Sequence, residues 1–221
     1  THSDRWEIPY LPIDPADVGR EYEPIIRINS QSGKGGAAFI MQEFGFKMPK
    51  AMHPEFGAVV QAACDKKGKE LKKQEVFDLF IEEYRNVCGP YQLLNHKFSE
   101  VKEENEALTK VHFTGTLKYN GDDPVQIEGT GSGPIGAFCQ AMNKVGLSDY
   151  QFVDYSEHAI SKGSDSKAIS YIHIKSPEGK DVFGIGISHN INYASIKGVL
   201  CAINSCQKNC VRAPQPPIFD K

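Results

Sequence analysis

Alternating apolar and polar positions run through the chain from residue 91 onward and predict strands joined by short turns. The expected strands cover residues 111–118, 124–128, 151–155, 168–175 and 182–187. Apolar helices are expected over residues 137–145 and around residues 195–202. Asn120-Gly121, between the first two strands, is typical of a hairpin turn. The predicted order is β-β-α followed by β-β-β-α.

The two predicted halves are similar in sequence at a fixed spacing. Lys118 matches Lys175 at a separation of 57 residues, and Gly129 matches Gly184 at a separation of 55. Such self-similarity indicates a duplicated unit whose halves share one core. We therefore predict an α+β fold with pseudo-two-fold symmetry.

The first 95 residues have a different pattern. Residues 1–50 predict a small α/β subdomain, with a strand at Ile26 and Ile28, a break at Gly33–Gly36 and a second strand at Ala38–Met41. Residues 51–95 predict a helical subdomain, because apolar positions recur at helical spacing on both sides of Gly68. The expected domains are residues 1–50, 51–95, 96–210 and a loose, proline-rich tail over 211–221.

Composition excludes several classes of protein. The 221 residues carry a net charge of −3, which gives no general attraction to nucleic acid or to an anionic membrane. No apolar run approaches the roughly 18 residues that a membrane-spanning helix needs, and no secretory signal is present. Six cysteines without a C-x-x-C pair are expected to be reduced thiols of an intracellular protein. Because the chain starts at Thr1, we expect a piece of a longer protein.

The segment Gly129–Gly136, GTGSGPIG, is the strongest candidate for a binding site. A glycine-rich turn that opens a helix leaves backbone N–H groups unpaired beside the positive end of the helix dipole, where they can hold a phosphate or a carboxylate. Pro134 and the preceding hairpin do not fit a dinucleotide fingerprint. A structural turn without a ligand remains the alternative.

Other motifs give weaker signals. SGKGG, residues 32–36, lacks the first glycine and the hydroxyl residue of a P-loop. Glu157 and His158 are neighbours on a predicted strand and so face opposite ways, and the histidines form no metal-binding cluster. A freestanding enzyme that uses Glu157, His158 or Lys34 as acid–base groups is kept as an alternative.

The segment WEIPYLPIDPADVGREYEPIIRINSQSGKGG resembles the linker of the longer 2-isopropylmalate synthases, and GTGSGPIGAF and DYSEHAIS resemble the leucine-sensing domain of that family. The resemblance covers about residues 5–207. It implies an acyltransferase that condenses acetyl-CoA with 3-methyl-2-oxobutanoate. The family's catalytic (β/α)₈ barrel and its divalent metal have no counterpart in this sequence. The chain alone is therefore expected to be inactive, with no catalytic residue and no metal or other cofactor of its own.

The resemblance also implies a regulatory site, a homodimer that works with the barrel of its own chain, and a cytoplasmic location or an organelle in a eukaryote. Tyr10 would take part in transmitting the inhibition by leucine. The implied leucine pocket consists of Gly131, Gly133, Pro134, Ile135, Gly136, Tyr155, Ala159, Ser166 and Ala168. Two alternatives stay open. One is an isoleucine-sensing part of a citramalate synthase, and the other is a structural dimerisation module with a vestigial pocket.

Overall fold

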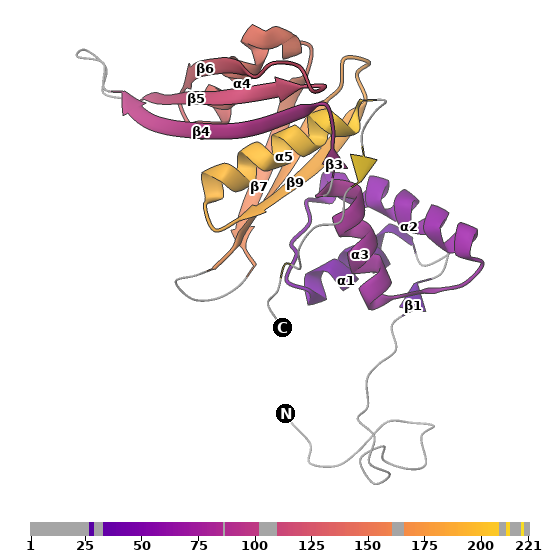
Figure 1. Ribbon diagram of the computed structural model, residues 1–221. Coiled ribbons are helices and arrows are strands. Elements are labelled where there is room, and N and C mark those ends of the chain that lie inside the picture. The colour runs from indigo at the N-terminus through magenta and orange to yellow at the C-terminus, as the bar shows by residue number, and fades with distance from the viewer. Residues whose placement is uncertain are drawn as a thin grey trace, which may run out of the picture.

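A computed structural model of the chain describes residues 27–28, 33–85, 87–101, 110–160, 166–207, 211–212 and 218. It places a helical region beside two three-stranded antiparallel sheets (Figure 1). The helical region contains α1 (Gly33–Glu43), the short turn η2 (Lys50–Met52), α2 (His53–Lys67) and α3 (Lys73–Tyr84). A two-residue strand, β1 (Arg27–Ile28), pairs with β2 (Leu71–Lys72) ahead of α3.

The first helix corrects the sequence prediction, which placed a glycine break and a second strand over residues 33–41. That segment is α1 instead. Ala37, Ile40 and Met41 are buried at the spacing of one helical face. A short apolar run does not distinguish a strand from a helix by its periodicity. Packing against α2 and α3 decided the outcome.

The two expected helices of residues 51–95 are confirmed as α2 and α3. Gly68 ends α2 in the left-handed conformation, with φ of 63°. Between the helices, the Phe80 ring meets the rings of Phe56 and Phe46 edge-on, at centroid distances of 5.1 and 6.0 Å. These aromatic contacts form the centre of the helical region's core.

Glu55, in the first turn of α2, makes this region sensitive to pH. Burial raises the pKa of its carboxyl group from 4.5 to about 7, and the negative charge of Glu83 adds to the effect. The folded protein therefore holds a proton that the unfolded chain releases, so stability falls as pH rises from 4.5 to 7. Urea unfolding of wild type and Glu55→Gln at about pH 5 and pH 8 is the test. Between these two pH values, we expect the unfolding free energy of Glu55→Gln to rise relative to that of wild type by on the order of 2 kcal/mol. A difference between the two proteins that does not change with pH would contradict this assignment.

The duplicated α+β domain is confirmed. Its first half contains β4 (Tyr91–Val101), β5 (Lys110–Tyr119), β6 (Val125–Gly131), α4 (Pro134–Met142) and a final helical turn, η3 (Asn143–Leu147). Its second half contains β7 (Gln151–Ala159), β8 (Ala168–Lys175), β9 (Asp181–Ser188) and α5 (Ile191–Ser205). The strand orders are β4-β5-β6 and β7-β8-β9. Helix α5 lies between the two sheets (Figure 1).

One strand of the first half, β4, was not among the strands predicted from the sequence. β4 pairs with β5 over its whole length, with an irregularity between Leu93 and Asn95 that interrupts the alternation of faces. The expected boundary between residues 95 and 96 falls inside this strand. Both halves are thus β-β-β-α units, and the repeat is more regular than the sequence indicated.

The second sheet is buried on both faces, which ties the domain to the helical region. From β8, Ile172 and Ile174 join the core with α4 and α5, whereas Ile169 and Tyr171 join the core of the helical region. The first sheet instead carries a polar network, in which the Thr116 hydroxyl donates to Asn95 (2.9 Å). The near-continuous apolar sequence of β8 reflects this double burial.

The carboxy-terminal segment differs from the expected loose tail in its described residues. β10 (Val211–Arg212) pairs with β3 (Val87–Cys88), the strand that follows α3. Ile218 is buried in the core of the helical region, and its carbonyl oxygen accepts a hydrogen bond from Lys167 Nζ (2.9 Å). The proline content of the segment gave no sign of these long-range contacts.

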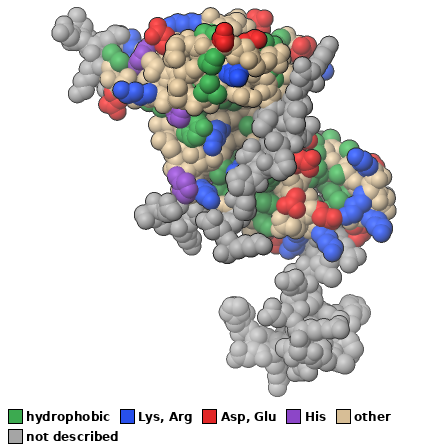
Figure 2. All heavy atoms as spheres, viewed as in Figure 1, with side chains coloured by type: hydrophobic (Ala, Val, Ile, Leu, Met, Phe, Trp, Pro, Cys, Tyr) green, Lys and Arg blue, Asp and Glu red, His purple; other side chains and the backbone are tan. Residues whose placement is uncertain are grey.

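The surface carries charges of both signs. On the face seen in Figure 2, Lys and Arg side chains alternate with Asp and Glu side chains, and neither sign covers the whole face. Among the described residues, no helix is long and apolar enough to cross a membrane.

Candidate functional site

Helix α4 begins within the glycine-rich segment, earlier than the predicted start at residue 137. Gly133 is the N-cap residue and Pro134 occupies the first turn, where its missing N–H costs nothing. The first intrahelical bond runs from the Ala137 N–H to the Gly133 carbonyl (3.0 Å). The N–H groups of Ile135 and Gly136 precede that bond, and no side chain caps this helix end. The local geometry is therefore that of an anion-binding helix start.

Two glycines of the segment have a packing role. A Cβ atom on Gly129 would lie 2.2 Å from the Ala137 carbonyl oxygen, and one on Gly131 would lie 2.5 Å from the Ala137 nitrogen. These glycines allow β6 to lie against the backbone of α4. Gly133 is different, because a Cβ atom there would meet nothing within 4 Å. Packing thus explains Gly129 and Gly131, as expected for a structural turn. The space beside Gly133, at the start of α4, stays open.

The second half repeats this packing. A Cβ atom on Gly184 would lie 2.4 Å from the Gly198 carbonyl oxygen, and one on Gly186 would lie 1.8 Å from the Ala194 carbonyl oxygen. Paired glycines on the last strand of each half therefore seat the helix that follows. This repeat explains the glycine match between the halves in the sequence.

Three other residues of the predicted pocket share one face of the second sheet. Tyr155 and Ala159 lie on β7, and the register pairs Ala159 with Ala168 on β8. Alternate residues of a strand share a face, and so do paired residues. The register also pairs Tyr155 with Ile172, which is buried against α5. This face therefore looks toward the core that α4 and α5 share.

The predicted pocket residues thus form two groups that border the same core. Ile135, at the start of α4, packs on that core, and Tyr155 remains 47% exposed. Ser166 is partly buried just before β8. Among the described residues, no hydrogen bond, ion pair or ring contact joins the two groups. Tyr10 lies outside the described residues.

An apolar cavity of about 130 Å³ lies between α4, β7 and α5. Cys139, Phe152 and Val199 line it, and burial raises the pKa of the Cys139 thiol to about 11. The Phe152 ring is 6.0 Å from the ring of Tyr155, centroid to centroid. The sequence pattern gives no sign of this cavity, because its walls come from elements that are distant along the chain.

Glu157 and His158 point to opposite faces, as the sequence predicted. Glu157 Oε2 lies 3.4 Å from the Ser195 hydroxyl on α5. His158 faces the helical region, where its Nε2 accepts the Lys47 N–H (3.1 Å) and lies 3.2 Å from the Tyr171 hydroxyl. His158 Nδ1 must then carry the proton, and it donates to the Ala159 carbonyl (3.0 Å). His158 thus joins the helical region to β7 and does not form an acid–base pair with Glu157.

The side chain of Lys34 lies outside the described part of the chain, and its acid–base role stays a prediction. Within the described ranges, no group of three or more His, Cys, Asp or Glu side chains could hold a metal ion. The polar groups near the pocket face that sequence analysis missed are Ser170 and Ser195. Both are buried, and their hydroxyl oxygens lie 3.1 Å apart.

Comparisons with known proteins give one family match near the start of the chain and a second over the domain that contains both sheets. A family model of the LeuA allosteric (dimerisation) domain matches residues 70–207. A family model of the α-isopropylmalate synthase post-catalytic domain matches residues 1–42. The first match begins inside the helical region, so that model includes α3 as well as both sheets.

Curated relatives are named 2-isopropylmalate synthase. The protein from Clostridium acetobutylicum is 48% identical over 200 residues, which is 90% of this chain and 36% of the relative. The protein from Corynebacterium glutamicum strain R is 42% identical over 90% of this chain and 32% of the relative. The protein from Rhodospirillum rubrum is 40% identical over 92% and 36%. The chain spans about a third of the length of these relatives. It belongs to the family of the LeuA allosteric (dimerisation) domain, preceded by the post-catalytic segment of the 2-isopropylmalate synthases.

Proposed function

We propose that this chain is the post-catalytic and leucine-sensing part of a 2-isopropylmalate synthase. The whole enzyme would be an acyltransferase that joins acetyl-CoA to 3-methyl-2-oxobutanoate, on a barrel that holds the divalent metal. The match to an allosteric domain and the names of the relatives support this proposal. In this arrangement the chain alone performs no condensation and regulates the barrel.

Leucine is the effector that the geometry favours. Its carboxylate would accept hydrogen bonds from the Ile135 and Gly136 N–H groups at the start of α4, and the helix dipole would add about 0.3–2 kcal/mol. Burial of its isobutyl group beside Tyr155 and Ala159 would contribute roughly 1.5–3 kcal/mol. The single observation that carries the proposal is that both groups of predicted residues border one core.

Glu157 completes the charge match to an amino acid. It lies on the pocket face of β7, between Tyr155 and Ala159, and its carboxylate is held beside the Ser195 hydroxyl. A carboxylate there suits the α-ammonium group, and the start of α4 suits the α-carboxylate. The feedback signal needs a coupling of only about 1–3 kcal/mol between this pocket and the barrel.

Self-association would use the exposed strand β7. Phe152 and Val153 are 37% and 45% exposed on this edge strand, beside Tyr155. Exposed apolar side chains on an unpaired edge are typical of an interface. We therefore place a homodimer contact next to the effector pocket, where a bound amino acid would influence the partner chain.

Calorimetric titration with leucine, isoleucine and valine tests the choice of effector. We expect leucine to bind with micromolar affinity, and isoleucine and valine to bind roughly tenfold more weakly, because one misplaced or missing methyl group is worth about 1–3 kcal/mol. Tighter binding of isoleucine would favour a citramalate synthase. Absence of heat for all three would leave a dimerisation module with a vestigial pocket.

A further inference from the structure

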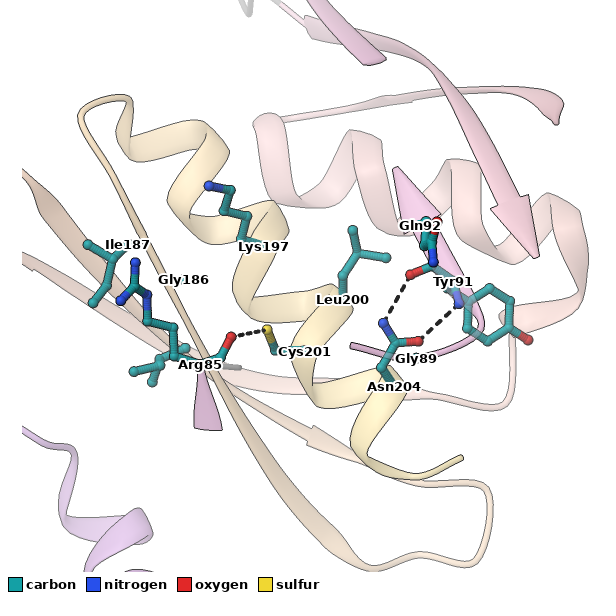
Figure 3. Close-up of a pocket in the computed structure, with 11 residues that line it drawn as sticks. Arg85, Gly89, Tyr91, Gln92, Gly186, Ile187, Lys197, Leu200, Cys201 and Asn204 are labelled. Atoms are coloured by element: carbon teal, nitrogen blue, oxygen red, sulfur yellow. Dashed lines mark hydrogen bonds between the residues drawn. The ribbon is translucent and has the colours of Figure 1, made fainter. Parts of the chain in front are cut away.

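The end of α5 is bonded to the start of the double-sheet domain. Asn204 is buried near the end of this helix, and its side-chain amide makes two hydrogen bonds to the backbone of Tyr91, the first residue of β4. The Tyr91 N–H donates to Asn204 Oδ1 (3.1 Å), and Asn204 Nδ2 donates to the Tyr91 carbonyl oxygen (3.0 Å) (Figure 3). An amide side chain offers one acceptor and one donor in the way that a paired strand does. These two hydrogen bonds form an asparagine clamp.

Two further contacts hold the connection between α3 and β4 against the same helix. The Cys201 thiol donates to the carbonyl oxygen of Arg85, the residue that follows α3 (3.2 Å). A Cβ atom on Gly89 would lie 2.5 Å from the Asn204 side chain, so only glycine lets the backbone pass this close. Helix α5 therefore contacts the connection at Arg85, Gly89 and Tyr91, and these three residues are called the joint below.

Open space adjoins the joint. A cavity of about 320 Å³ is lined by Arg85 and Tyr91 from the joint, by Ile187 from β9 and by Lys197 and Asn204 from α5 (Figure 3). Close packing fixes the position of a segment in a protein core, and here part of that packing is missing. The position of the joint therefore depends on the polar contacts of the clamp.

The other end of α5 borders the proposed leucine pocket. The Ser195 hydroxyl lies 3.4 Å from Glu157 Oε2, the group proposed to bind the ammonium group of leucine, and 3.1 Å from the Ser170 hydroxyl on β8. Ser195 and Asn204 lie on one continuous helix of 15 residues, about 14 Å apart along its axis. Rigid helices with contacts at both ends can couple two sites. Helix α5 has such contacts, to the pocket at one end and to the joint at the other.

We propose that α5 carries the effector signal from the leucine pocket to the joint, and that Asn204 is the positioning residue at the receiving end. This inference rests on the proposed function, because leucine supplies the input. An amino acid bound at Glu157 would fix the start of α5, and the clamp would then hold the joint in one arrangement. The helical region would in turn be held in one position against the double-sheet domain.

Amide hydrogen exchange of the unaltered chain, measured residue by residue by NMR, tests this transfer. The Arg85 N–H donates to the Ile81 carbonyl oxygen (3.1 Å) and reports on the helical side of the joint. Saturating leucine should slow its exchange by about fivefold to fiftyfold, which lies within the usual range of coupling between two sites. The Gly68 N–H, at the end of α2, is the internal reference and should keep its rate.

Asn204→Ala removes the clamp. The Tyr91 N–H should then exchange roughly tenfold to a hundredfold faster, because two hydrogen bonds are lost at the joint. Leucine should still bind this variant, with an affinity within about tenfold of wild type. The exchange rate of the Arg85 N–H should no longer respond to leucine. A role in stability alone would raise the exchange rates and leave that response intact.

Asn143→Ala is the matched control. A Cβ atom on Gly129 would meet the backbone of Ala141, and one on Gly184 would meet the backbone of Ala202. Asn143 and Asn204 each lie two residues beyond these alanines, so they hold equivalent positions on α4 and α5. Asn143 is exposed, and its variant should respond to leucine as wild type does.

Calorimetric titration with leucine, run in parallel, separates this inference from the proposed function. Leucine binding without a change in Arg85 exchange, or with equal slowing at Gly68, would overturn the transfer and leave the proposed function standing. Equal slowing at Arg85 in wild type and Asn204→Ala would overturn the role of the clamp and favour transfer through His158 and the Lys47 N–H. Absence of heat with leucine would overturn the proposed function, and the transfer with it.

Discussion

Gly186→Ala is expected to unfold the regulatory domain at moderate temperature. The added methyl group would lie 1.8 Å from the Ala194 carbonyl oxygen and 2.7 Å from the Gly198 nitrogen. Both are backbone atoms of α5, so the helix must move off the sheet. We expect a loss of about 3 kcal/mol or more, which lowers the melting temperature by roughly 6–12 °C for a chain of this size. Thermal unfolding followed by circular dichroism measures it.

Gly35→Ala is the matched control for that change. Gly35 is an exposed residue of α1, and a Cβ atom there would meet nothing within 4 Å. The same substitution should leave stability unchanged or raise it by about 0.5–1 kcal/mol, because alanine loses less backbone entropy in a helix. If Gly186→Ala were as stable as Gly35→Ala, the close backbone contact between α5 and β9 would be contradicted.

Gly133→Asp is expected to abolish leucine binding while the fold stays intact. Gly133 has extended backbone angles, with φ of −161° and ψ of 175°, which any residue adopts, and open space where the side chain would begin. The aspartate would cap α4 and place its own negative charge at the N–H groups proposed for the ligand carboxylate. We expect the leucine affinity to fall roughly a hundredfold or more. Titration calorimetry gives the affinity, and thermal unfolding verifies the fold.

Gly133→Ala separates charge from bulk at the same position. Alanine fills similar initial space but has no carboxylate, so its leucine affinity should stay within a few-fold of wild type. A folded Gly133→Asp variant that binds leucine as tightly as wild type would rule out the start of α4 as the carboxylate site. If Gly133→Ala lost binding to the same extent, steric fit rather than charge would control this position.

Local sequence pattern was sufficient for most of the double-sheet domain. The alternation in β5, the Asn120-Gly121 turn with positive φ at both residues, and the helices after each sheet are all set by neighbouring residues. The duplication was visible because each half needs glycines where its helix meets its last strand. Because the helix backbone leaves no room for a side chain at these positions, both halves carry glycine there, and the match is visible in the sequence.

Elements whose conformation depends on distant partners were not predictable in this way. The apolar run of α1 fits a strand or a helix until α2 and α3 bury it. The irregular alternation of β4 does not predict a strand by itself, and the strand is evident only from its pairing with β5. The carboxy-terminal segment is fixed by β3 and by the core of the helical region, which precede it by more than a hundred residues.

The sequence by itself determined the α+β repeat, the glycine-rich helix start and the resemblance that assigns the family, because these features are written in short continuous segments. Only the tertiary structure decided which glycines pack and which stay open, which face of β7 meets the core, and that Arg85 and Lys197 share a cavity. Those properties depend on distances between atoms that are remote along the chain. Hydrophobic burial fixes such distances only when all the elements have been assembled.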